Sequence, residues 1–149
     1  MQQPYMKEYL EPTLNPHRLL FVKMSENQEY DTLSMIDKYR QSSQIRKKMD
    51  EGNWSALNKG WKQLFNDVNF ADCTAKTTTI DDILLHWIAD IYVLLQWMYN
   101  IPSKSINNII SAKTMCSIYN PLHETSEKTA CEKIYKRYFL QSDSKNTIA

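Results

Sequence analysis

Residues 79–100, TIDDILLHWIADIYVLLQWMYN, form the longest and most apolar run of the chain, and this run restricts the fold more than any other feature. It contains neither glycine nor proline. Its apolar residues recur every three or four positions, which is the period of a helix and not of a strand. They form two rows, one of Ile80, Leu84, Trp87, Ile91, Leu94, Leu95 and Met98 and one of Ile83, Ile88, Tyr92 and Tyr99. Because two such rows cover most of a helix, the sequence predicts a central helix that is buried on several sides.

Polar residues mark the limits of this helix. Thr79 can cap its N-terminus, and Asp82 stands three residues later, where a capping box has its acid. Pro102 disfavours helical geometry in the residue before it and ends the helix near Asn100. A helix of about 21 residues spans roughly 30 Å, which is also the thickness of a bilayer core. Carboxylates within the run make a membrane span costly, so we expect a core helix and no membrane partner.

The remaining sequence also favours helices. Only two glycines occur among 149 residues, and a sheet-rich fold uses glycine in its turns and bulges. Apolar periodicity predicts helices over residues 29–51 and 53–66, and short helices after Pro102. A last long helix is expected to begin at Asn120-Pro121, with asparagine as the cap and proline in the first helical position.

The N-terminal 28 residues do not share this pattern. Prolines at positions 4, 12 and 16 are expected to break any long helix there, which leaves an arm with a short extended segment. The sequence therefore predicts a single all-α domain over residues 1–149, a compact bundle of about five to six helices around the central helix. Its parts would be an N-terminal arm (1–28), a helical body (29–140) and a frayed polar tail (141–149).

Composition limits the classes of partner and location. The net charge of +1 offers no broad basic surface, so nucleic acid is not an expected partner. The three cysteines, Cys73, Cys116 and Cys131, have no metal-like spacing, and their odd number favours a reducing, cytoplasmic setting. The first residues, MQQPYMKEYL, lack the apolar core of a secretory signal. No glycine-rich phosphate loop or other cofactor motif is present, so we expect no cofactor.

One polar stripe on the central helix suggests a metal or acid–base site. Asp82, His86 and Asp90 stand at i, i+4 and i+8, and two carboxylates beside an imidazole can orient it and raise its pKa. Together with His123 and Glu124 they would offer the donors that helical bundles use for divalent metals. The alternative is that the three side chains make ordinary solvated contacts on the helix surface.

Residues 92–111 suggest a DNA-binding alternative. An apolar helix, the connection NIPS and a short second helix resemble a helix-turn-helix. Lys104, Asn107 and Asn108 would then be the side chains that reach base edges.

The C-terminal half also resembles a group of proteins. The segment LLHWIADIYVLLQWMYNIPSKSINNII, followed by SIYNPLHETSEKTACEKIYKRYF, is similar to small uncharacterised helical proteins of Gram-positive bacteria and their phages. Some of these are encoded beside toxin-like genes, so the resemblance implies an antitoxin, an immunity protein or a phage–host component. It implies no particular functional residues.

These observations favour a small cytoplasmic protein-interaction module over an enzyme, because no catalytic motif is present. Its partner would be another protein or a second copy of the chain. An enzyme that uses Asp82, His86 and Asp90, and a DNA-binding regulator that uses residues 92–111, remain the alternatives.

Overall fold

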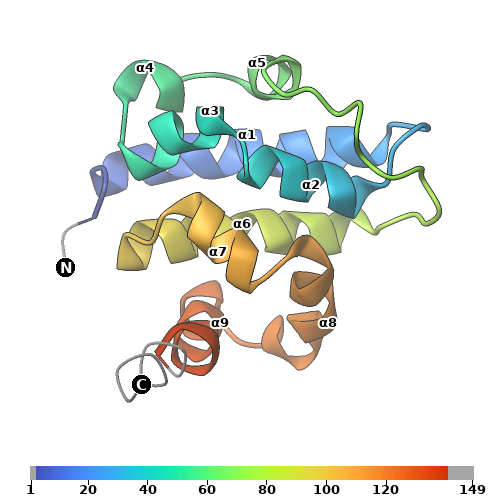
Figure 1. Cartoon of the computed structure of the whole chain (residues 1–149). Helices are drawn as coiled ribbons and strands as arrows, with labels where there is room; N and C mark the ends of the chain where they lie inside the picture. The colour runs from blue at the N-terminus through green and yellow to red at the C-terminus, as the bar shows by residue number, and fades with distance from the viewer. Residues whose placement is uncertain (1–2, 141–149) are drawn as a thin grey trace, which may run out of the picture.

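The computed structural model describes residues 3–140, in which it contains helices and no strand (Figure 1). The predicted all-α class is therefore confirmed. In chain order the elements are the 3₁₀ turn η1 (Lys7–Tyr9), α1 (Leu10–Ser25), α2 (Thr32–Arg40), α3 (Ser43–Ile45), the π-helical turn η2 (Arg46–Asp50), α4 (Trp54–Leu57), α5 (Trp61–Asn66), α6 (Asp82–Tyr99), α7 (Ser103–Ile109), α8 (Ala112–Leu122), α9 (Glu127–Ile134) and the π-helical turn η3 (Tyr135–Leu140).

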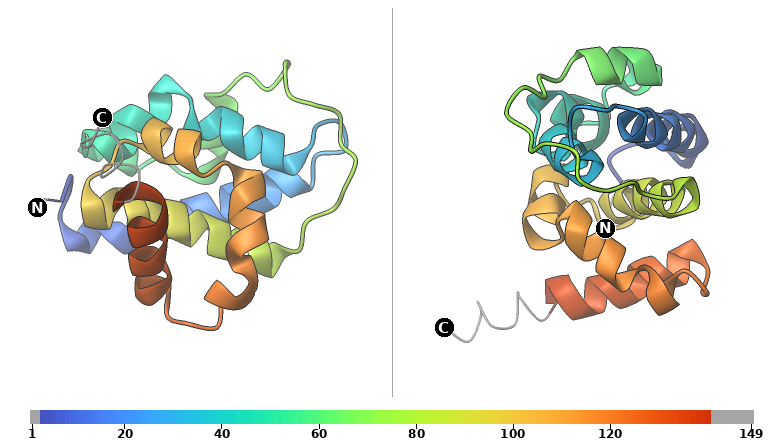
Figure 2. Two further views of the ribbon diagram at one scale, coloured as in Figure 1. Left: turned by 60° about the horizontal axis from the view of Figure 1, so that its bottom comes forward. Right: turned by 90° about the vertical axis from the view of Figure 1, so that its right-hand side faces the viewer.

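The helices stack in layers around α6. The order is α4 and α5, then α1 and α2, then α6 and α7, and finally α9 with the end of α8 (Figures 1 and 2). α1 runs antiparallel to α6 and makes the most extensive contact of any pair, while α7, α8 and α9 contact other sides of α6. The central position predicted for this helix is explained by its apolar rows, which meet several neighbours at once.

The ends of α6 differ slightly from the prediction. Asp81, and not Thr79, is the N-cap, and its side chain accepts the backbone N–H of Ile83 at 2.7 Å. Asn100 ends the helix in the left-handed conformation (φ 49°, ψ 44°), which asparagine tolerates better than most residues. The middle of α6 is largely buried, but Ile83 near its start is 70% exposed.

Helix α1 lies where the sequence predicted a proline-broken arm, and that prediction was wrong. Pro12 falls in the first turn, where the missing N–H has no helical acceptor to lose. Pro16 does remove an internal hydrogen bond, at a cost of roughly 3 kcal/mol. However, Leu20, Phe21 and Met24 are fully buried, and burial of three such side chains contributes roughly 5–9 kcal/mol. The burial outweighs the loss at Pro16, so the helix persists.

Two helices predicted as continuous are interrupted, and α1 adds one more, which explains why nine α-helices are found within residues 3–140 instead of five to six. Ser42 is extended (φ −73°, ψ 152°) and separates α2 from α3. Gly60 is extended as well (φ −78°, ψ 172°) and separates α4 from α5.

The last helix also begins later than predicted. Asn120 has non-helical angles (φ −96°, ψ 128°) and precedes a cis peptide bond to Pro121, so this pair kinks the end of α8. α9 begins at Glu127, after Ser126, whose hydroxyl accepts the N–H of Thr129. Proline is common at the first position of a helix, which is why Pro121 was expected to begin the last helix. In the structure the helix ends at Leu122, directly after this proline.

Two cations lie inside the bundle. Arg40 is fully buried, with its guanidinium carbon 4.6 Å from the centre of the Tyr92 ring. Lys48 is 1% exposed, and its Nζ has no hydrogen-bond partner among the described residues. Burial, assisted by the nearby Lys59, lowers the pKa of Lys48 to about 8.

Helix α9 and turn η3 are joined to the end of α6 by aromatic stacking. The rings of Tyr99 and Tyr135 lie 3.9 Å apart and are inclined by only 3°.

None of the helices within residues 3–140 has the length and apolar character that crossing a bilayer would need.

Candidate functional site

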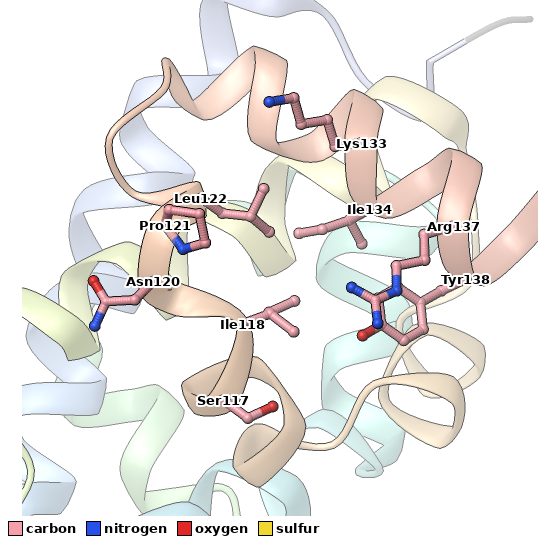
Figure 3. Close-up of a pocket in the computed structure, with 9 residues that line it drawn as sticks. All are labelled: Ser117, Ile118, Asn120, Pro121, Leu122, Lys133, Ile134, Arg137 and Tyr138. Carbon is pink, nitrogen blue, oxygen red and sulfur yellow. The ribbon is translucent and has the colours of Figure 1, made fainter.

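A groove of about 450 Å³ lies between α8 and the α9–η3 segment (Figure 3). Its volume is within the range of about 300–1,000 Å³ that is typical of ligand sites. We call it the α8–α9 groove, and it is lined by Ser117, Ile118, Asn120, Pro121, Leu122, Lys133, Ile134, Arg137 and Tyr138.

The floor of the groove is apolar. Ile134 is buried at its base, and Figure 3 shows Leu122 and Ile134 pointing toward each other across it. Ile118 projects from the preceding turn of α8 into the same space. The kink at Asn120-Pro121 turns the end of α8 away from a straight path, so the groove remains lined by side chains that a continuous helix would place elsewhere.

The edge of the groove is basic. Lys133 and Arg137 are one turn apart on the α9–η3 segment, and both are exposed. Neither pairs with a carboxylate in the part of the chain that the structure describes. The Arg137 guanidinium lies 5.3 Å from the Tyr138 ring, and this contact leaves its N–H groups available to an acceptor.

The polar stripe of α6 does not converge on one point. Asp82 and His86 are exposed, whereas Asp90 is buried and its carboxylate is held by Arg18. Arg18 Nε donates to one carboxylate oxygen at 2.5 Å, and Nη2 donates to the other at 3.1 Å. Residues 3–140 contain no cluster of three or more His, Cys, Asp or Glu side chains that could hold a metal. The metal interpretation therefore has no geometric support in this part of the chain.

Of the two further donors suggested for that site, His123 is engaged with another residue. His123 stacks on Tyr119 with ring centres 4.1 Å apart, and its Nδ1 lies 2.9 Å from the Tyr119 carbonyl oxygen. Glu124 is exposed beside it.

Two partners of Asp90 were not anticipated from the sequence. One is Arg18, and the other is Glu127 at the start of α9, whose pKa is raised to about 8 by burial and by the neighbouring Asp90 carboxylate. An aspartate within an apolar helix is a signal that a partner is needed, but the sequence alone could not say which one. Asn15, Arg18, Leu19, His86 and Asp90 line a shallow depression beside this pair.

The proposed DNA-reading side chains have different environments. Lys104 is exposed, but Asn107 is buried, and its Nδ2 donates to Asp37 at 2.7 Å. Gln41 Nε2 donates to the side-chain oxygens of both Asn107 and Asn108. The asparagines therefore attach α7 to α2, and the Asn107 side chain is buried in that contact.

No protein-family model matches the chain, and comparison with curated proteins and with solved structures finds no match either.

Proposed function

We propose that the protein is a protein-interaction module whose α8–α9 groove binds a short segment of another protein, apolar on one side and acidic on the other. The observation that supports this most directly is the combination of an apolar floor with two basic side chains at the edge. The floor would accept aliphatic or aromatic anchors, while Lys133 and Arg137 would pair with carboxylates of the ligand.

An amphipathic helix is the form of ligand that suits the groove best. Helix-in-groove recognition places apolar anchors of the ligand at i, i+3 or i+4 and i+7 in a trough between helices. Acidic residues on the same helix would face the basic edge, and arginine can bind a carboxylate with two N–H groups. We extend the proposal to the role that the sequence resemblance implies, an antitoxin, immunity or phage–host component that acts in the cytoplasm on a partner protein.

Position-specific photo-crosslinking in cells tests this proposal. A photoreactive residue at Ser117, on the edge of the groove, should capture a partner, whereas one at Lys62, exposed on α5, should not. The partner segment identified in this way, prepared as a peptide, should then bind the purified protein. The double variant Lys133→Glu with Arg137→Glu should weaken that binding by about ten-fold or more, because two charge pairs become repulsive.

A matched control is available on other helices. Lys47 and Lys104 are exposed lysines outside the groove, and the variant Lys47→Glu with Lys104→Glu should leave the affinity unchanged. Equal affinity for the groove variant and the wild type would refute the proposal. A crosslink only to a second copy of the chain would also refute it, in favour of self-association.

A further inference from the structure

The imidazole ring of His17 is enclosed where α1 meets α2, and both of its nitrogen atoms are hydrogen-bonded. Nδ1 lies 2.7 Å from the carbonyl oxygen of Thr13, one turn earlier in α1. Nε2 lies 2.7 Å from the hydroxyl oxygen of Tyr39 in α2. Within residues 3–140, no other side-chain hydrogen bond joins these two helices. The His17 ring therefore fastens α1 to α2.

These two hydrogen bonds require the neutral ring. A carbonyl oxygen only accepts, so Nδ1 carries the hydrogen and Nε2 accepts from the Tyr39 hydroxyl. A protonated ring would present an N–H on both sides, and the fully buried hydroxyl would have to accept instead. Its own hydrogen would then need another acceptor, but in the described part of the chain His17 is its one hydrogen-bond partner. Uptake of a proton therefore disrupts the contact between the two helices.

The charges around His17 also oppose a proton. Arg40 in α2 and Lys48 in η2 are fully buried cations, and both disfavour the protonated ring. Lys59 lines the same narrow space as His17 and Lys48. The carboxylate of Asp67 lies 3.2 Å from Lys59 and 4.0 Å from Lys48, so it already faces two lysines. The other residues that line the space are uncharged: Thr13, Pro16, Ala56, Leu57 and Leu64.

The open and packed forms of this junction differ in their affinity for a proton. Burial is the main cause that lowers the pKa of His17 from 6.5 to about 3; the Thr13 carbonyl acts in the opposite direction, and Arg40 and Lys48 lower it further. The phenols of Tyr5 and Tyr39 stay neutral, because burial raises the pKa of both. A His17 ring released into water regains a pKa of about 6.5. Acidification below pH 6.5 therefore favours the released form, which binds the proton that the packed form excludes.

Helix α1 depends on its burial. Pro16, directly before His17, removes a hydrogen bond from the middle of the helix, and the burial of its apolar face outweighs that loss. Leu14, His17, Phe21 and Met24 stand at i, i+3, i+7 and i+10 and belong to this buried face. A charged His17 would have to reach water, and its apolar neighbours on the same face would leave the core with it.

We propose that His17 is an acid-sensitive switch for the packing of α1. The neutral ring joins α1 to α2 through Tyr39. When the pH falls, a proton from solvent binds to Nε2, the Tyr39 hydroxyl loses its acceptor, and α1 leaves the bundle. The protein is thereby progressively less able to keep α1 packed as its surroundings become acidic. The switch involves no ligand and does not depend on the function of the α8–α9 groove.

The state of the ring is tested in the wild type by long-range ¹H–¹⁵N NMR of its histidines. The chain has three, so glutamine variants of His86 and His123 assign two spectra and leave the third to His17. At pH 7.5, His17 should show the neutral tautomer with its hydrogen on Nδ1, and the packed form should keep it down to pH 4.5. The tautomer with its hydrogen on Nε2 would overturn the switch. An imidazolium spectrum of His17 while α1 stays packed would overturn it as well.

The release of α1 is tested by hydrogen exchange of the Leu20 and Phe21 backbone amides, corrected for the intrinsic effect of pH on exchange. From pH 7.5 to pH 4.5, their protection should fall about 100-fold more in the wild type than in His17→Gln, because below pH 6.5 one proton changes the opening equilibrium about ten-fold per pH unit. His86→Gln, at an exposed histidine, is the matched control and should behave like the wild type.

An equal fall of protection in His17→Gln and in the wild type would remove the switch. If the glutamine variant does not fold, the tautomer and charge of the wild-type ring decide the matter.

Discussion

Replacement of Lys48 by methionine is expected to stabilise the protein. The Lys48 ammonium group is almost fully buried, and the nearest carboxylate oxygen, of Asp67, is 4.0 Å away and lies closer to Lys59, at 3.2 Å. A buried charge without a good partner is costly. Methionine has a similar length and flexibility, so it should fill the same space without the charge.

The size of the expected gain in the free energy of unfolding follows from the pKa of Lys48. Its fall from 10.5 to about 8 corresponds to about 3 kcal/mol, at 1.36 kcal/mol for each pH unit. Because local relaxation and solvent screening reduce such values, we expect Lys48→Met to add about 2 kcal/mol to the free energy of unfolding at pH 7. For a chain of 149 residues this is a rise in Tm of about 4–8 °C.

The difference in stability between Lys48→Met and the wild type should decrease as the pH rises. Below pH 8 the folded protein carries the charged lysine, and the penalty is fully present. Between pH 8 and pH 10.5 the unfolded chain binds more protons at this position than the folded one, so the stability of the wild type rises with pH and the advantage of the variant shrinks.

Urea unfolding of both proteins at pH 7 and pH 10 measures the difference. Lys47→Met, at an exposed neighbouring lysine, is the control and should change the stability by less than about 0.5 kcal/mol. The reasoning is refuted if Lys48→Met is no more stable than the wild type at pH 7, or if its advantage is as large at pH 10.

Three further substitutions, one of them a control, test the backbone at Gly52 and the attachment of α7. Gly52→Ala should destabilise the protein by about 1–3 kcal/mol, because φ is +63° there and a Cβ would lie 2.1 Å from the Pro4 carbonyl oxygen. Gly60→Ala, with nothing within 4 Å of its Cβ, should be neutral in the same urea titration, and equal effects of the two changes would contradict the structure. Asp37→Ala should lower the free energy of unfolding by about 2–3 kcal/mol, because it leaves the Asn107 amide and the first N–H of α8 without their acceptor. Hydrogen exchange should then show faster exchange of backbone amides confined to α7 and the start of α8.

The central helix could be predicted because its signal is local. The apolar rows of residues 79–100 need only a period, and any compact fold would bury them. α1 could not be predicted in the same way, because proline propensity opposed it and tertiary burial decided the outcome. The breaks at Ser42 and Gly60 depend on how the short helices pack, which a periodic pattern does not record.

The candidate site was harder to predict than the fold. Ile118 and Leu122 follow a helical pattern, but the groove exists only because α8 kinks at Asn120-Pro121 and α9 returns beside it. The contact between Arg18 and Asp90 joins residues 72 positions apart, and sequence spacing holds no information about such a pair. Only the need of Asp90 for some partner was visible in the sequence.

The stacked pair Tyr99 and Tyr135 gives the protein an optical signal of its own. Two phenol rings 3.9 Å apart and nearly parallel couple their electronic transitions, and in a fixed chiral setting such a pair should produce a near-ultraviolet circular dichroism band. The two rings belong to α6 and to η3, so the band should be lost when the α9–η3 segment leaves α6, even while the rest of the bundle stays folded. The position of α9 can therefore be followed in unlabelled protein.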